Sequence, residues 1–211
     1  MHKILLLHGY HKTPKDMQVL GRNLSLLGFE CESVRLPLTF QTIEACAELF
    51  AGVFERYTER LAPGEKVSLA GHSSGGLVIR QFLAESPLAS RVHRAVLIGT
   101  PNSGTVLADI AAKYVKPYVR LFKTMQSLQS SRFAGLPAPP VETGAIAGSR
   151  NDLLLGRLLS PESDGRVEIS SVQIEGLTDF LILPYNHLQI HYEMETAAAV
   201  ARFIRTGRFA D

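Results

Sequence analysis

Short apolar runs alternate with longer segments of helical period along the chain, and this alternation most constrains its fold. Three of the runs, Leu5–Leu7, Val67–Ala70 and Ala95–Ile98, are largely apolar at consecutive positions instead of at every second one. Such runs are typical of central strands in a parallel sheet, because both faces of those strands are covered. The pattern therefore predicts a three-layer α/β sandwich with a mostly parallel sheet.

Six strands and four main helices are expected from this alternation. The expected strands span Lys3–Leu7, Glu30–Leu36, Lys66–Ala70, Val92–Gly99, Glu142–Ala147 and Asp179–Leu183. The expected helices span Thr13–Leu27, Ile43–Leu61, Gly76–Glu85 and Tyr192–Arg205. Because the chain has 211 residues and a typical domain has about 150, we expect a single domain over residues 1–211.

Residues 102–140 do not fit the alternation, because no expected strand interrupts them. The connection is too long for a structureless loop in a compact domain, so we expect an inserted helical cap. Pro117 is expected to kink its helix or split it in two. Apolar residues at three- and four-residue spacing are predicted to share one face of the cap: Leu107, Ile110, Tyr114, Tyr118, Leu121, Met125 and Leu128. Basic residues follow the same period on another face: Lys113, Lys116, Arg120 and Lys123.

The charges are divided unevenly between this cap and the rest of the chain. Overall, 22 Lys and Arg face 20 Asp and Glu, a balance that argues against a nucleic-acid-binding protein. The cap holds five basic residues, including Arg132, and only Asp109 as an acid, a net charge of +4. A basic stripe beside an apolar face is typical of a helix on an anionic membrane, although most such stripes are simply solvated. Weak membrane-surface contact through the cap is therefore a hypothesis.

The sequence shows no signal peptide, no membrane-spanning run and no disulfide or metal pattern of cysteines, and these features bear on the cellular compartment. The first apolar stretch, Ile4–Leu7, is too short for the core of a signal peptide. No run of about 18 apolar residues suggests a membrane span. Cys31 and Cys46 match no metal-ligand or redox spacing, and we expect both to be free. A soluble, cytoplasmic protein is expected.

The segment Gly71-His72-Ser73-Ser74-Gly75 joins an expected strand directly to an expected helix. This context is required for a G-x-S-x-G elbow, a sharp turn that holds the central serine hydroxyl above the sheet. The flanking glycines avoid a clash where the turn closes, and the serine itself takes a strained conformation. Ser73 is therefore the candidate nucleophile. Ser74 is a poorer candidate because His72 would stand in its glycine position, and we expect His72 to pack, form hydrogen bonds or line the pocket.

A serine hydroxyl needs a base that takes its proton and an acid that orients this base. After an elbow of this kind, the acid and then the base follow the serine along the chain. His187 follows the last expected strand, at the sheet edge where the elbow lies, and is the predicted base. His191, inside or at the start of the final helix, is the alternative base. His93 is disfavoured because it opens a strand at the opposite edge of the sheet. Two acids, Asp152 and Asp164, satisfy the chain order.

Hydrolysis also needs hydrogen-bond donors aimed at the oxyanion of a tetrahedral intermediate. One predicted donor is the backbone N–H of Ser74, the residue after the candidate nucleophile. The other comes from the loop after the first strand, His8-Gly9-Tyr10, and the N–H of Tyr10 is the best candidate. The oxyanion hole is thus predicted from two segments far apart in sequence.

These segments together resemble the α/β-hydrolase superfamily and, within it, the bacterial lipases and esterases. The similar segments are Leu5–Tyr10, Gly71–Gly76, Gly99–Gly104, Ser163–Val167 with Ser170 and Ser171, and Asn186–Leu188. The resemblance covers nearly the whole chain outside residues 102–140. It implies Asp164 as the acid in preference to Asp152.

Two departures from the family pattern are visible. The chain begins almost at once with the oxyanion-loop strand, so the antiparallel strands that usually open the family's sheet are missing and a minimal sheet of about six strands is implied. Several bacterial lipases bind calcium through an acidic residue soon after the catalytic histidine, where this chain has Leu188 and Gln189. A neutral Gln189 is a poor ligand for calcium. We therefore expect neither a metal nor another cofactor.

The resemblance and the residues together predict a serine hydrolase of carboxylic esters that forms an acyl-enzyme. Ser73 would attack, His187 would move the proton and Asp164 would hold the imidazolium. The apolar face of the cap favours a small-molecule ester with a hydrophobic acyl group as substrate. A thioesterase or an acyltransferase would use the same residues. A non-catalytic binding protein on this scaffold is the alternative from another functional class.

Overall fold

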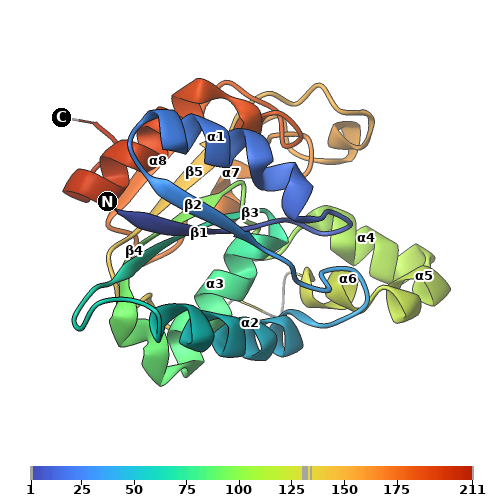
Figure 1. Ribbon diagram of the computed structural model, residues 1–211. Helices are drawn as coiled ribbons and strands as arrows, with labels where there is room; N and C mark the ends of the chain where they lie inside the picture. Colours follow the sequence, from blue (N-terminus) through green and yellow to red (C-terminus); the bar gives the residue numbers. More distant parts are fainter. Residues whose placement is uncertain (1, 130–132, 134, 211) are drawn as a thin grey trace.

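Six parallel strands form one sheet in the computed structural model, which describes residues 2–129, 133 and 135–210 (Figure 1). The strands lie in the order β2-β1-β3-β4-β5-β6, and every hydrogen-bonded pair is parallel. Their bounds are β1 Lys3–Leu7, β2 Glu30–Val34, β3 Val67–His72, β4 Val92–Ile98, β5 Thr143–Gly148 and β6 Asp179–Leu183. The predicted six-stranded parallel sheet is confirmed.

Helices cover both faces of this sheet and complete the three layers (Figure 1). Helices α1 and α8 pack on one face, and α2 and α3 pack on the other. Leu6 of β1 contributes to the core under α1 and α8, whereas Leu7 contributes to the core under α2 and α3. Because successive side chains of a strand point to opposite faces, a strand covered on both sides has to be apolar throughout. The bounds are α1 Gln18–Leu26, α2 Ile43–Thr58, α3 Ser74–Glu85 and α8 Met194–Thr206.

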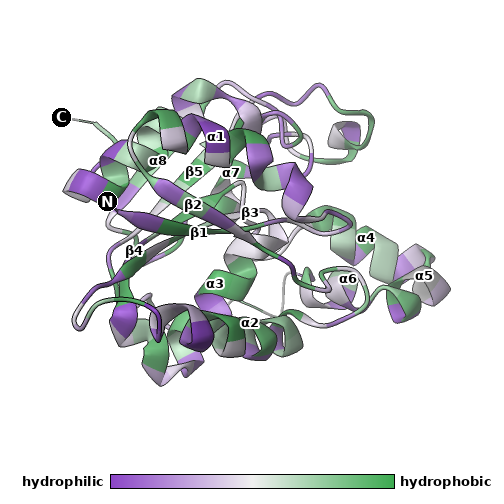
Figure 2. Cartoon of the chain, viewed as in Figure 1, coloured by the Kyte–Doolittle hydropathy of each residue, from purple (hydrophilic) through white to green (hydrophobic). Residues whose placement is uncertain are grey.

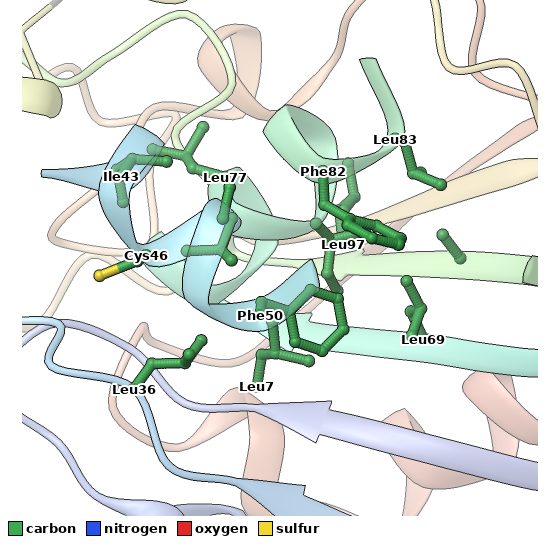
Figure 3. Close-up of a cluster of buried hydrophobic side chains, with 14 of the residues drawn as sticks. Leu7, Leu36, Ile43, Cys46, Phe50, Leu69, Leu77, Phe82, Leu83 and Leu97 are labelled. Atoms are coloured by element: carbon green, nitrogen blue, oxygen red, sulfur yellow. The ribbon is translucent and has the colours of Figure 1, made fainter. Parts of the chain in front are cut away.

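Aromatic rings fill the core between the sheet and the helix pair α2 and α3. The Phe82 ring of α3 lies 5.0 Å, between centroids, from each of the Phe50 and Phe54 rings of α2. All three side chains are essentially inaccessible to solvent. Figure 3 shows Phe50 and Phe82 among leucines from three neighbouring strands, Leu7, Leu69 and Leu97. This packing anchors α3, the helix that carries the candidate nucleophile at its start.

Both cysteines are free, as predicted. Cys46 is buried in the core under α2, whereas Cys31 on β2 is only partly buried. Burial raises the pKa of Cys46 to about 12 and that of Cys31 to about 11. Because the thiolate is the reactive form of cysteine, neither side chain is a candidate nucleophile at neutral pH.

Local sequence sets where the helices begin and end. Thr42 caps α2, because its hydroxyl oxygen accepts the N–H of Ala45. Gly207, with a φ of 78°, ends α8 in the left-handed conformation that glycine adopts readily. Within the described part of the chain, no helix combines the length and hydrophobicity needed to cross a bilayer. Short helices complete the connections: η1 Pro14–Met17, η2 Pro87–Arg91, η3 Leu154–Leu158, α7 Ile169–Val172 and η4 Ile190–Tyr192.

The described part of residues 102–140 contains three short helices, α4 Val106–Tyr114, α5 Lys116–Leu121 and α6 Lys123–Ser127, between β4 and β5. The expected break near Pro117 is present. Val115 leaves the helical conformation, with φ −127° and ψ 48°, and Pro117 then lies in the first turn of α5. Proline is tolerated in a first turn because it lacks the N–H that an interior position would need.

The prediction that the apolar residues of this segment share a single face is wrong. A second break, at Phe122, turns α6 away from α5. Tyr114 and Leu121 are 72% and 61% exposed, whereas Leu128 is 6% exposed, so these side chains do not share one buried face. Figure 2 shows hydrophobic segments on α4 and α5 outside the body of the molecule. The side chains of Tyr118 and Lys116, and all of Arg132, lie outside the described residues.

Candidate active site

Ser73 lies at the tip of the turn between β3 and α3, as the motif predicts. Its backbone has φ 54° and ψ −126°, a left-handed conformation that a residue with a Cβ rarely adopts. A hydrogen bond to the neighbouring strand stabilises the turn: the Ser73 N–H donates to the carbonyl of Ile98 on β4 at 2.8 Å. Strain of this kind costs about 1–3 kcal/mol and is typical of functional sites.

The two flanking glycines are required by close backbone approaches. A Cβ on Gly71 would lie 2.7 Å from the carbonyl carbon of Gly75. A Cβ on Gly75 would lie 2.4 Å from the carbonyl oxygen of Leu7 on the neighbouring strand β1. Real Cβ contacts are never this short. The sequence pattern around Ser73 is therefore a steric requirement of the turn.

Ser73, His187 and Asp164 form a continuous hydrogen-bonded series. The Nε2 of His187 lies 3.0 Å from the Ser73 hydroxyl oxygen, and its Nδ1 lies 2.7 Å from Oδ2 of Asp164. An ionised carboxylate only accepts hydrogen bonds, so the proton of a neutral His187 ring is on Nδ1. Its Nε2 then carries the lone pair that faces the serine hydroxyl.

Asp164 is fully buried, and each of its carboxylate oxygens has partners. Oδ1 accepts the backbone N–H groups of Arg166 and Val167 at 2.9 and 2.8 Å, which leaves Oδ2 for His187. The backbone also joins the two residues, because the His187 N–H donates to the Asp164 carbonyl at 2.9 Å. The carboxylate is thus fixed in one orientation by its own loop and by His187.

Gly99, directly after β4, makes room for this pair. A Cβ at its position would lie 3.3 Å from both Asp164 Oδ2 and His187 Nδ1. Its φ of 55° also disfavours any side chain. The glycine therefore allows the side chains of Asp164 and His187 to lie close to the end of β4.

The alternative residues have other partners. The carboxylate of Asp152 accepts a hydrogen bond from the side chain of Asn186, next to the base, at 2.8 Å. The ring of His191 is within hydrogen-bond distance of Asp16, and that of His93 is within hydrogen-bond distance of the carbonyl of Ile204. None of these contacts involves Ser73.

The loop after β1 runs beside the candidate nucleophile. A Cβ on Gly9 would lie 3.1 Å from the Cβ of Ser73, so the segment that leads to Tyr10 touches the elbow. The buried His8 fixes this loop: its Nε2 accepts the N–H of Leu36, which leaves its Nδ1–H to donate to the Gly9 carbonyl. Sequence reasoning treated His8 only as part of a turn. A histidine at the end of a buried strand was the signal that could have revealed this role.

Ser74 begins α3, and the first N–H groups of a helix have no acceptor within the helix. Its side chain is buried, and its hydroxyl has no hydrogen-bond partner among the described residues. The elbow therefore exposes one hydroxyl, that of Ser73, toward the base. The N-terminal end of α3 also favours negative charge beside Ser73.

Hydrogen bonds also tie the segment after β4 to the acid loop, and sequence reasoning missed them. The Thr105 hydroxyl donates to the Arg166 carbonyl at 2.8 Å, and the Ser171 hydroxyl donates to the Gly104 carbonyl at 2.5 Å. The side-chain amide of Asn102 donates to the carbonyl of Val172. These bonds hold the loop of the acid in place without contacting the acid itself.

One group of described side chains, Asp16, His72 and His191, is compact enough to be considered as a metal site. Its potential ligand atoms all lie within 4.8 Å of one another. The Lys12 ammonium, however, lies 3.2 Å from the Asp16 carboxylate and would repel a cation. The two imidazole rings are stacked, with centroids 3.8 Å apart, so their in-plane lone pairs do not converge on one point. The group therefore fits a metal ion poorly.

Comparison with known proteins identifies similar structures but no similar sequence. No family model matches the chain, and no curated protein does. The mature Bacillus licheniformis lipase BlEst2 is 17% identical, with a TM-score of 0.81 over 98% of this chain and 91% of that chain. The metagenomic carboxyl esterase MGS0156 is 15% identical, with a TM-score of 0.74 over 97% of this chain and 75% of that chain. The RedJ thioesterase of Streptomyces coelicolor is 16% identical, with a TM-score of 0.63 over 95% of this chain and 84% of that chain.

Proposed function

Given the α/β-hydrolase fold that this chain has, we propose that it hydrolyses carboxylic esters through an acyl-enzyme formed on Ser73. The observation that carries the proposal is the hydrogen-bonded series from Ser73 through His187 to the buried Asp164. The lipase and esterase among the similar structures agree with it. The fold alone would not be enough to support this proposal, because one fold supports many functions.

In the first half of the reaction, the Ser73 oxygen attacks the ester carbonyl while His187 Nε2 takes the hydroxyl proton. The imidazolium that forms is stabilised by the Asp164 carboxylate, which lies 2.7 Å from Nδ1. The same proton then passes from Nε2 to the leaving alkoxide, and the acyl group remains on Ser73. In the second half, His187 takes a proton from water while the water oxygen attacks the acyl carbonyl carbon. The bond from this carbon to the Ser73 oxygen then breaks, the carboxylic acid leaves, and His187 returns the proton to Ser73.

The negative charge of each tetrahedral intermediate would be held by the backbone N–H groups of Ser74 and Tyr10. Support comes from the position of Ser74 at the start of α3 and from the contact of Gly9 with Ser73. Fixed donors of this kind stabilise the transition state because they need no reorganisation during the reaction. The His8 bonds that fix the loop after β1 would contribute to this rigidity.

The preferred substrate is a small ester with a hydrophobic acyl group, and residues 102–140 would serve as a cap over it. Exposed apolar side chains support this assignment: Tyr114 on α4, Leu121 on α5, and Val115 between the two helices. In Figure 1 these helices lie beyond the carboxyl ends of the strands, where the candidate site is. Their exposed basic residues, Lys113 and Arg120, would favour weak contact with an anionic membrane surface.

A thioester is a second candidate substrate, since the RedJ thioesterase is among the similar structures. The same three side chains serve both reactions, because only the leaving group differs. Parallel assays with an ester and a thioester of the same acyl chain would rank the two substrates by kcat/KM.

A fluorophosphonate probe tests the proposed function directly, because it labels activated serines. We expect labelling of the wild-type protein and of a Ser74→Ala variant, but none of Ser73→Ala. p-Nitrophenyl esters of increasing chain length then give the acyl preference. A correctly folded wild-type protein that neither reacts with the probe nor hydrolyses any ester would refute the proposal, and would favour a non-catalytic binding protein on this scaffold.

A further inference from the structure

A second histidine, outside the candidate triad, holds the main chain of the candidate base. His72 is the last residue of β3 and directly precedes Ser73. Its Nε2 lies 3.1 Å from the backbone carbonyl oxygen of His187, and the two imidazole centroids are 4.8 Å apart. Since His72 is 2% exposed, no solvent competes for this bond.

The direction of this hydrogen bond is fixed by chemistry. A carbonyl oxygen can only accept, so Nε2 of His72 carries the proton. Burial, together with the neighbouring His191 and His187, lowers the pKa of His72 well below its usual value. The ring is therefore neutral, and its Nδ1 is a bare lone pair, which has no partner among the described residues. A buried acceptor without a hydrogen-bond partner costs free energy. The hydrogen bond from Nε2 of His72 contributes in the opposite direction.

The ring of His72 is held from behind by His191. The two rings are stacked, with centroids 3.8 Å apart and planes inclined by 21°. Nε2 of His191 in turn donates to the Asp16 carboxylate at 3.1 Å. Burial opposes the charge on Asp16, but hydrogen bonds from His191 and Tyr192, with Lys12 nearby, keep the pKa of this carboxyl well below its usual range.

We infer that His72 is a positioning residue for the reaction proposed above: its Nε2–H holds the carbonyl of His187, so that the imidazole is aligned between Ser73 and Asp164. His187 lies in the connection after β6, and a side chain in such a connection keeps its place only if the backbone is held. His72 provides this hold from β3, the strand that also carries the nucleophile. The stacked His191, bound to Asp16, limits rotation of the His72 ring.

A matched pair of variants tests this inference. Gln and Met have nearly the same length and volume, but only Gln can place an N–H donor near the position of Nε2. We expect His72→Met to lower kcat for p-nitrophenyl butyrate by about tenfold to a hundredfold, with little change in KM. His72→Gln is expected to recover most of the lost turnover. Thermal unfolding of both variants is measured alongside.

A spectroscopic signature separates alignment from general stability. The short bond between His187 Nδ1–H and Asp164 is expected to give a far-downfield proton resonance in the wild-type protein. This resonance should remain in His72→Gln and broaden or disappear in His72→Met. Equal kcat values in the two variants, whether both high or both low, would overturn the inference.

The histidine tautomer can be read from the wild-type protein, even if His72→Met does not fold. Nitrogen-15 shifts of the imidazole should show a protonated Nε2 and a bare Nδ1 at His72. A proton on Nδ1 would mean that Nε2 cannot donate to His187, and the inference would fail. Failure of the proposed function looks different: the wild-type protein would then show no ester hydrolysis that depends on Ser73, whatever the state of His72.

Discussion

Replacement of Asp164 by Asn changes only one atom of the carboxylate, and the structure predicts how the site responds. Oδ1 accepts two backbone N–H groups, so an amide nitrogen at that position would face two donors. The Asn oxygen therefore takes the Oδ1 position, and the NH₂ group faces His187. A donor there requires the lone pair on Nδ1, which moves the proton of His187 to Nε2.

With its proton on Nε2, His187 cannot accept the hydroxyl proton of Ser73. Loss of the correct tautomer lowers kcat by about 10³–10⁴-fold, which corresponds to about 4–5 kcal/mol of transition-state stabilisation. The backbone hydrogen bonds of the acid loop are kept, so we expect the free energy of unfolding of Asp164→Asn to change by less than about 2 kcal/mol.

Steady-state hydrolysis of p-nitrophenyl butyrate and urea unfolding measure these two effects separately. Asp152→Asn is the matched control, because it makes the same change in an acid that bonds Asn186 instead of the base. We expect its kcat to stay within about threefold of the wild-type value. If Asp164→Asn kept wild-type turnover, or if Asp152→Asn lost it, the assignment of the acid would be wrong.

Three further predictions concern stability. Phe50→Ala should lower the free energy of unfolding by about 3–5 kcal/mol, because it removes a fully buried ring from the core; a loss below about 1 kcal/mol in urea titrations would contradict this packing. Gly75→Ala should prevent folding, since its Cβ would lie 2.4 Å from a β1 carbonyl, whereas Gly52→Ala in the middle of α2 should be neutral or stabilising by up to about 1 kcal/mol; circular dichroism of the two variants decides. Burial lowers the pKa values of His72 and His191, so the unfolded chain binds more protons below about pH 6.5 and stability should fall from pH 7 to pH 5; unfolding free energies that rise on acidification would argue against these two neutral rings.

Much of the fold and the candidate nucleophile could be predicted because their signals are local. The consecutive apolar residues of β1 and the glycines around Ser73 each describe one strand or one turn. His187 could be placed at the correct edge because the end of a parallel strand fixes that edge. In each case the structure agrees with a pattern read over fewer than about ten residues.

The remaining features depend on contacts between distant parts of the chain. Asp152 and Asp164 lie in the same connection between β5 and β6, and chain order does not separate them. Their partners differ in the folded chain: Asp164 accepts from the ring of His187, whereas Asp152 accepts from the side chain of Asn186.

The break at Phe122 lies where the Phe122 ring packs against His11 and Phe40, with centroids 4.9 and 5.7 Å apart. These partners come from distant parts of the chain, and a helical period within residues 102–140 does not reveal them.

The hydrogen-bonded series of the candidate site comes from the connections after β3, β5 and β6, and α4–α6 supply none of its members. In the proposed function, bond breaking and the choice of substrate would therefore depend on separate stretches of the chain. An engineer could exchange residues 106–127 for other helices and keep Thr105 and the loop of the acid intact. New acyl preferences could in this way be selected while Ser73, Asp164 and His187 stay unchanged.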